Sequence, residues 1–356
     1  MQPLHRFVCL LAVAVLMTSW SPVCEGMDVR VENGRLLVNG EPFFFLSTSG
    51  IVVSLDEMKR HHLNTVFSWS RKLMTDVADD ATRLGFMLMP FVQSPGADQD
   101  AIRKMVVSFR DNQNLLAWNI GDDLNATHKD AVMQAVALVR KLDPKHRPIA
   151  FDAIRDEREM APYADLFCTY YYPLLKREWS LRAYREFLER HARLREMRVK
   201  LKPSQAFWTW VQVHTQFWYT HRVHGGPERA HIASRFPDAE HIRLLTYEAL
   251  AAGCKGIIYY SHRFLAPDWY GKDRYAEVGI LGAELSIVGR LIADSERIHG
   301  ARALARRVHA QALKGPFGLL IVLIVEGKDY QFQPAEGRIE NVRVRVPVIP
   351  RGAKAL

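Results

Sequence analysis

Cysteine is scarce in this 356-residue sequence, which has only four. Two of them, Cys9 and Cys24, lie within the first 26 residues. The other two, Cys168 and Cys254, each lie in an apolar stretch typical of a buried strand. A fold held together by a framework of disulfides is therefore excluded, and the chain must rely on a large hydrophobic core.

Long hydrophobic runs are also missing. A membrane-spanning helix needs about 20 apolar residues, and no stretch of the sequence supplies them, so no membrane span is predicted. The short apolar run Phe7–Met17 follows His5 and Arg6 and precedes small and polar residues, which is typical of a secretory signal. We therefore predict a cleaved signal peptide over residues 1–26 and a mature protein that is secreted or periplasmic.

Several patterns that would assign other functions are absent. The net charge of +9 is spread along the chain without a basic tail, so no nucleic-acid partner is predicted. There is no Gly-rich phosphate loop and no Gly-x-Ser-x-Gly elbow, which argues against nucleotide binding and esterase activity. A zinc site is an alternative for one His-rich segment, but its spacing matches no ligand motif; these histidines are His214, His221, His224 and His231. No metal or cofactor is predicted, and the oligomeric state stays open.

What the sequence does contain is an alternation of apolar runs with amphipathic helical stretches. Such alternation is typical of βαβ units around a parallel sheet. The candidate strands are Phe43–Ser47, Thr65–Trp69, Phe86–Val92, Leu115–Ile120, Ile149–Ala153, Leu166–Tyr172, Gln205–Val211 and Gly256–Ser261. Eight units of this kind close a barrel. The predicted fold class is α/β, a (β/α)8 TIM barrel.

Shorter segments flank the predicted barrel, which spans residues 27–302. Val29–Val38, followed by the turn residues Asn39 and Gly40, predicts an antiparallel hairpin at its start. A small C-terminal antiparallel β domain is predicted over 303–356, from the alternating runs Phe317–Val325, Tyr330–Gln333 and Ile339–Val348. The long insert His214–Asp238 follows the seventh strand, and it should lie on the C-terminal face of the barrel, where such folds keep their sites.

Four stretches near the strand ends carry a more specific pattern. They are Leu36–Phe44, Asn114–Asp123, Ala164–Pro173 and Tyr247–Ser261. In order and register they resemble parts of the retaining (β/α)8-barrel glycoside hydrolases, the superfamily of β-galactosidases, cellulases and β-mannanases, and the likeness runs from about Leu36 to Ile298. The resemblance implies a carbohydrate partner, either an oligosaccharide or a polysaccharide.

The resemblance also indicates catalytic positions. Retaining hydrolysis needs one carboxyl group to protonate the leaving oxygen and a second one to attack the sugar. The superfamily's acid/base position at the end of strand four corresponds to Asp123. Its nucleophile position at the end of strand seven corresponds to Gln212, a neutral amide that cannot form the glycosyl ester in the ordinary way.

Because Gln212 stands where the superfamily has a carboxylate nucleophile, three alternatives follow. Asp123 could work in an inverting pair with Asp122, Asp152 or Asp268, or Glu228 of the insert could supply the nucleophile. The barrel could also bind sugar without cutting it. The leading hypothesis is a secreted hydrolase of O-glycosidic bonds in an extracellular carbohydrate, and the alternative is a catalytically inactive carbohydrate-binding barrel.

Substrate-binding candidates are chosen for their position at strand ends. Aromatic rings stack on sugar rings, and amide or imidazole groups bond to hydroxyls. The predicted set is Trp69, Gln93, Asp122, Asp152, Tyr172, Trp210, Gln212, Tyr260 and His262. Each has a structural alternative: the aspartates could cap helices, and the amides could bond to buried carbonyls. Tyr171 is a further aromatic residue near a strand end, and half of this aromatic group could face the core. A structural envelope protein without a ligand would bury Trp69, Tyr172 and Trp210 together.

Overall fold

The computed structural model describes residues 27–92, 96, 98–175, 181–199, 204–214, 237–266, 271–316, 318–325 and 339–347. The predicted signal peptide lies outside the described residues, as do Gln93, Glu228 and Asp268. In the ranges that are described, no helix has the length and apolar character needed to cross a membrane.

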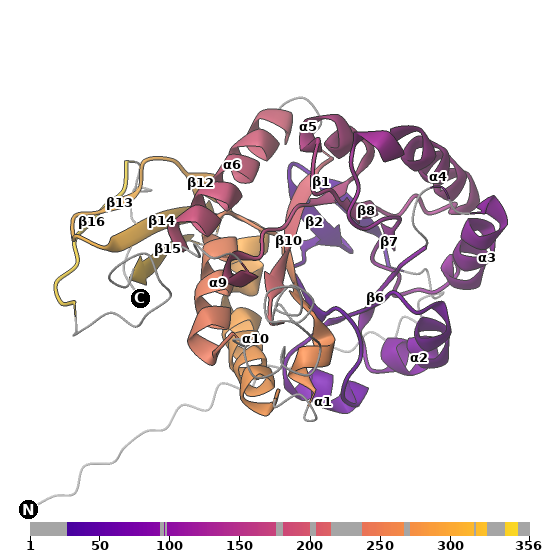
Figure 1. The fold of residues 1–356 in the computed structure, drawn as a ribbon, viewed down its shortest axis with the longest axis horizontal. Helices are drawn as coiled ribbons and strands as arrows, with labels where there is room; N and C mark the ends of the chain where they lie inside the picture. Colours follow the sequence, from indigo (N-terminus) through magenta and orange to yellow (C-terminus); the bar gives the residue numbers. More distant parts are fainter. Residues whose placement is uncertain are drawn as a thin grey trace, which may run out of the picture.

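All eight predicted barrel strands form, and all of them are parallel to their neighbours. They are β4 (Phe45–Thr48), β5 (Thr65–Ser68), β6 (Met87–Pro90), β7 (Trp118–Asn119), β8 (Ile149–Asp152), β9 (Leu166–Cys168), β10 (Ala206–Gln212) and β11 (Gly256–Tyr260). Six of them pair in the order β4-β11-β10-β9-β8-β7, so the first strand lies beside the last, and β5 pairs with β6. The predicted TIM-barrel fold is therefore confirmed (Figure 1).

Single bridges and side-chain bonds complete the ring. Parallel bridges at Leu88–Leu115 and Phe91–Asn119 connect β6 to the β7 segment. Between β4 and β5, Asn64 replaces a ladder, because its backbone N–H donates to the Leu46 carbonyl over 3.1 Å and its side-chain oxygen accepts from the Leu46 N–H over 2.8 Å. Hydrogen bonds thus join every pair of neighbouring strands.

Helices surround the ring of strands in Figure 1. They are α1 (Leu55–Arg60), α2 (Arg71–Arg83), α3 (Gln99–Phe109), α4 (Lys129–Leu142), α5 (Glu157–Met160), α6 (Leu181–Val199), α9 (Ala239–Ala251) and α10 (Lys272–Ala293). Short 3-10 turns lie at Ala126–His128, Ala161–Tyr163, Pro173–Leu175 and His262–Leu265. Ser54 caps α1, since its hydroxyl accepts from the Glu57 N–H at 3.2 Å.

The strands separate two hydrophobic cores because their side chains alternate between two faces. The outer core lies between strands and helices, and the inner core fills the barrel with residues such as Phe45, Trp208 and Ile258. The hairpin β1 (Val29–Glu32) and β2 (Arg35–Val38) contributes Val29 and Leu36 to the inner core. The predicted antiparallel hairpin is thus present, and β3 (Glu41–Pro42) pairs with β2 across the turn Asn39-Gly40.

Antiparallel strands follow the barrel, and Figure 1 shows them beside α6 and α9. One sheet has the order β12-β14-β15, with β12 over Glu296–Ile298, β14 over Val308–Gly315 and β15 over Gly318–Val325. A second pair joins β13 (Arg302–Ala303) to β16 (Val344–Arg345). The first strand of these sheets, β12, lies ahead of residue 303, the predicted start of the C-terminal domain.

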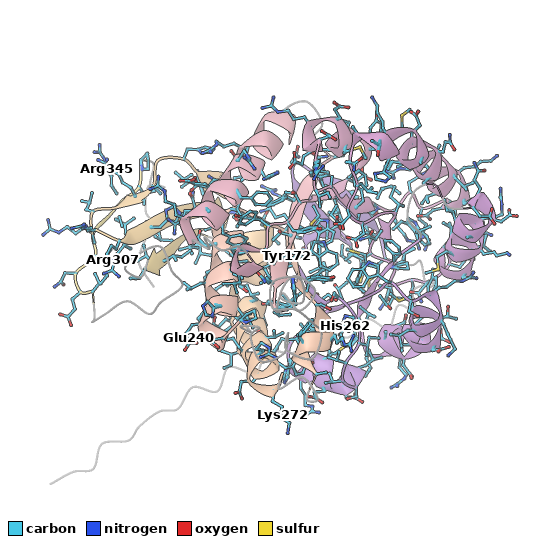
Figure 2. The ribbon with its side chains drawn as sticks, viewed as in Figure 1. Tyr172, Glu240, His262, Lys272, Arg307 and Arg345 are labelled. Carbon is cyan, nitrogen blue, oxygen red and sulfur yellow. The ribbon has the colours of Figure 1, made fainter. Side chains whose placement is uncertain are left out.

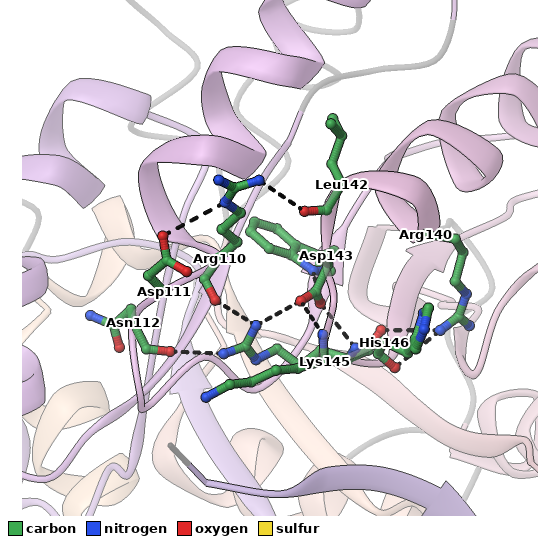
Figure 3. A network of polar contacts seen from close by, with 10 residues as sticks. Arg110, Asp111, Asn112, Arg140, Leu142, Asp143, Lys145 and His146 are labelled. Atoms are coloured by element: carbon green, nitrogen blue, oxygen red, sulfur yellow. Dashed lines mark hydrogen bonds and ion pairs between the residues drawn. The ribbon is translucent and has the colours of Figure 1, made fainter. Parts of the chain in front are cut away.

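A buried ion pair lies near the start of β8 (Figure 3). Arg147 donates to the Asp143 carboxylate at 2.8 Å, and both side chains are only 1% exposed. Arg147 also donates to the carbonyls of Arg110 and Asn112, at 2.7 and 3.1 Å. Asp143 in turn accepts from the Trp118 indole at 2.8 Å. The network therefore ties β7 to the segment that leads into β8.

Gly256 on β11 is a position where close packing forbids a side chain. A Cβ atom placed there would lie 2.1 Å from the ring of Phe45 on the neighbouring strand β4. We expect Gly256→Ala to lower the free energy of unfolding by about 1–3 kcal/mol in chemical denaturation, because the inner core would have to shift. Gly289→Ala on α10 is the control, since its nearest atom would lie at 3.6 Å and alanine favours helix by about 0.5–1 kcal/mol. Equal stability of Gly256→Ala and the wild type would contradict this account.

Candidate functional site

Three carboxylates converge at the C-terminal ends of β7 and β8. Asp122 and Asp123 follow β7, and Asp152 is the last residue of β8. One oxygen from each of them lies within 4.8 Å of the others. The backbone N–H of Asp123 donates to Asp152 at 2.8 Å, which fixes the turn after β7 against the end of β8. Among the residues that the structure describes, these three are also the group whose spacing could hold a metal ion.

Two of these carboxyl groups share a hydrogen bond, and both have raised pKa values. Burial is the main cause that raises the pKa of Asp152 well above its usual value, and the adjacent charge of Asp122 adds to it. Burial also raises the pKa of Asp122, as does the charge of Asp123. The Trp210 indole donates to Asp152 at 3.1 Å and favours the ionised form, but burial outweighs it. The pair therefore retains a proton at a pH where isolated carboxyl groups have lost theirs.

This retained proton predicts a pH dependence of stability. The folded chain keeps a proton on Asp152 above 3.8, the ordinary pKa of an aspartate, whereas the unfolded chain does not. The contribution of this proton to the free energy of unfolding is complete below pH 3.8 and is lost as the pH rises through the raised pKa of Asp152. We expect the wild type to lose stability with rising pH across this window, and Asp152→Asn to lose less, because only the raised pKa of Asp122 then remains. Denaturant unfolding of both proteins over a pH series measures the free energy of unfolding. The same pH dependence in both proteins would contradict the retained proton on Asp152.

Aromatic rings surround the carboxylates in two stacks. Tyr172 lies between Tyr170 and Tyr260, with ring centroids 4.6 and 5.5 Å away and interplanar angles of 26° and 13°. Trp69 stacks on Trp210 at 5.5 Å and 12°. The Tyr170 hydroxyl donates to Asp123, which connects the tyrosine stack to the acidic group.

The exposure of the predicted residues divides them into two groups. Trp69, Tyr172, Tyr260 and His262 are partly exposed, and so is Asp122, while Asp123 is exposed. Asp152, Trp210 and Gln212 are buried. Figure 2 shows Tyr172 and His262 inside the ring of helices. Trp69 and Tyr172 are thus partly exposed to solvent, whereas a ligand-free envelope protein would bury both of them together with Trp210.

Gln212 occupies the end of β10, and its side chain is engaged by the backbone. It is 1% exposed, its amide oxygen accepts from the Leu174 N–H at 3.1 Å, and its amide nitrogen donates to the His214 carbonyl at 3.1 Å. These bonds are of the kind that satisfies a buried amide. The end of β10 therefore presents an amide, and not a carboxylate, at the position predicted for the nucleophile.

His214 was the first member of the zinc alternative, and its three partner histidines lie outside the described residues. The side chain is fully buried, and its Nδ1 bonds to the Tyr260 carbonyl over 3.0 Å. Burial lowers the pKa of His214 to about 4, so the ring is neutral at neutral pH. It packs edge-on against Tyr172 and Tyr260, with centroids 4.6 and 5.0 Å away, and thereby supports the tyrosine stack.

Tyr170 is the residue of this site that the sequence analysis did not select. It belongs to the run Tyr170-Tyr171-Tyr172, and the period of two along a strand separates the members. Tyr170 and Tyr172 pack against the inner core, while Tyr171 packs against the outer core and stacks on Phe187 at 5.2 Å. Counting alternate positions from Leu166 and Cys168, both in the inner core, would have identified Tyr170.

Comparisons by sequence give no relatives, because no family model matches the chain and no curated protein is significantly similar to it. Solved structures are similar in fold. A glycoside hydrolase family 5 protein from Bacteroides vulgatus matches with a TM-score of 0.55 and 16% identity, over 83% of this chain and 80% of that one. A β-glucuronidase from Bifidobacterium dentium matches with a TM-score of 0.45 and 17% identity, over 66% of this chain and 43% of that one. A Ruminococcus gnavus β-glucuronidase matches with a TM-score of 0.48 and 10% identity, over 66% of this chain and 47% of that one.

This chain thus spans less than half the length of both β-glucuronidases. The match to the family 5 protein, in contrast, extends over most of both chains. At this level of identity it is the fold that is shared. The protein has a (β/α)8-barrel fold that is similar to the fold of the family 5 glycoside hydrolase.

Proposed function

We propose that the protein hydrolyses O-glycosidic bonds of a carbohydrate at the C-terminal face of the barrel, with Asp123 as the proton donor. The observation that carries this proposal is the convergence of three carboxyl groups next to partly exposed aromatic rings, with burial raising the pKa of two of them. Glycoside cleavage requires a carboxyl group that is still protonated when it meets the leaving oxygen. In this proposal the Asp122–Asp152 pair keeps a proton and passes it to Asp123, the exposed member of the group, whose carboxylate oxygen lies within 4.8 Å of theirs.

The other residues have complementary roles in this proposal. The partly exposed rings of Trp69 and Tyr260 bind the apolar face of a sugar ring, and Tyr172, stacked between Tyr170 and Tyr260, holds the Tyr260 ring in place. Tyr170 orients the Asp123 carboxylate through its hydroxyl. Asp152 is buried, so it acts through Asp122 and the Asp123 backbone, without touching the sugar. The signal peptide predicted over residues 1–26 leads us to propose an extracellular carbohydrate.

Binding to carbohydrate is tested with Trp69→Ala. We expect the wild type to bind at least one member of a panel of cellobiose, lactose, mannobiose and soluble polysaccharides in calorimetry, and to release a reducing sugar from it. Loss of the stacking face should weaken binding by about 0.5–1.5 kcal/mol, roughly three- to tenfold in Kd. Trp69→Phe keeps an aromatic face and serves as the control. Unchanged affinity in Trp69→Ala would show that the sugar binds elsewhere.

A second candidate function is sugar binding without cleavage. Gln212 favours it, because the end of β10 lacks a carboxylate and the amide is already bonded to backbone groups. The three aspartates all belong to the neighbouring strands β7 and β8, so they do not flank a sugar from two sides. Retaining and inverting enzymes both need carboxyl groups on two sides of the scissile bond. Calorimetric binding of a panel member with no sugar released would favour this second function.

A further inference from the structure

A histidine after the last barrel strand is held by residues after the first. His262 follows β11, Ser49 and Gly50 follow β4, and these two strands are paired. The backbone N–H of His262 donates to the Ser49 hydroxyl oxygen at 2.8 Å, and the same oxygen lies 3.1 Å from Nδ1 of the His262 ring. Ser49 itself is fully buried. One buried hydroxyl thus contacts both the backbone and the ring of His262.

The geometry of Ser49 determines where the ring carries its hydrogen. A buried hydroxyl hydrogen needs an acceptor, and the Ser49 oxygen already accepts the His262 N–H. Within the described part of the chain, Nδ1 of His262 is the acceptor that lies within bonding distance of this hydroxyl. If the Ser49 hydroxyl donates to Nδ1, the hydrogen of a neutral imidazole is on Nε2.

Gly50 and the neighbouring aromatics fix the ring's place. A Cβ atom at position 50 would lie 2.7 Å from both Cε1 and Nε2 of His262, so a side chain there would displace the ring. The ring is partly exposed, and its centroid lies 6.5 Å from that of Trp69. Burial, together with the adjacent charge of Arg263, lowers the pKa of His262, so the ring is neutral at neutral pH.

We propose that Ser49 and Gly50 position His262 so that its Nε2–H donates a hydrogen bond to a hydroxyl oxygen of the bound carbohydrate. His262 is then a ligand-contacting residue beside the Trp69 face, and Ser49 and Gly50 are positioning residues that act through it. The sugar contact rests on the proposed function, whereas the state of the ring does not. The two can therefore fail separately.

Nitrogen NMR of the His262 ring tests the positioning without any ligand. We expect the wild type to show a protonated Nε2 and an acceptor Nδ1, Ser49→Ala to show a mixture of the two neutral forms, and Ser49→Thr to restore the wild-type pattern. The control is Ser286→Ala, which removes an exposed hydroxyl on α10. A wild-type ring with its hydrogen on Nδ1 would overturn the proposal, whatever the protein binds.

Calorimetry with the same panel of cellobiose, lactose, mannobiose and soluble polysaccharides tests the sugar contact. For a member of the panel that the wild type binds, we expect Ser49→Ala and His262→Ala each to weaken affinity about three- to tenfold, the effect of one neutral hydrogen bond. Ser49→Thr should restore it. Wild-type affinity in His262→Ala would overturn the sugar contact. Absence of binding by the wild type would overturn the proposed function and the contact with it, and the NMR pattern would still decide whether Ser49 positions the ring.

Discussion

Asp123→Asn is expected to reduce glycoside hydrolysis by about 10²–10⁴-fold, the usual contribution of a positioned general acid. Asparagine keeps the shape of the side chain and can still accept a hydrogen bond from Tyr170, but it cannot give up a proton to the leaving oxygen. The loss should therefore fall on kcat, while the affinity for the sugar changes little. Initial rates of reducing-sugar release and calorimetric Kd values on the same samples separate the two quantities.

Asp156→Asn is the matched control for this substitution. Asp156 is an exposed aspartate after β8, and like Asp123 it has a positive φ, which asparagine tolerates. Its carboxylate accepts from the Ala126 backbone outside the acidic group. We expect this variant to keep wild-type turnover. Full turnover in Asp123→Asn would show that the proton donor is another group, and equal loss in both variants would point to a general effect of charge on this face.

The strand pattern of the barrel could be predicted because buried parallel strands are continuous apolar runs with sharp boundaries. Ile149–Ala153 and Gly256–Ser261, for example, differ from β8 and β11 by a single residue at one end. The β14 strand was not predicted, since four consecutive residues from Ala310 to Leu313 are buried and hide the period of two. Its assignment depends on contacts with β12 and β15 on both sides, which local sequence does not reveal.

The candidate site was predictable in position but only partly in chemistry. Strand ends placed Asp122, Asp123 and Asp152 on one rim, because parallel strands bring their carboxyl ends to the same face. The shared proton could not be predicted, since it depends on how completely tertiary packing buries Asp152. In the same way, the backbone bonds of Gln212 reach Leu174, which is distant in sequence.

Arg147→Met is expected to lower the free energy of unfolding by about 3–5 kcal/mol, the largest change in stability that we expect for a single substitution here. The variant leaves Asp143 charged and buried without its cation, and the carbonyls of Arg110 and Asn112 lose their donor. Methionine fills much of the same space, so the loss comes mainly from the unpaired charge and the unsatisfied carbonyls. Chemical denaturation followed by tryptophan fluorescence measures it.

The matched control is Arg83→Met, which removes an exposed ion pair with Asp80 whose two side chains are 69% and 67% exposed. Such pairs contribute about 0–1 kcal/mol, so this variant should unfold almost like the wild type.

Arg147 precedes the start of β8, whereas Asp152 is at its other end, so sugar affinity of the folded Arg147→Met protein should be unchanged. Wild-type stability in Arg147→Met would mean that water or rearrangement satisfies Asp143. A loss of affinity without a loss of stability would mean that the network transmits strain along β8 to the acidic group.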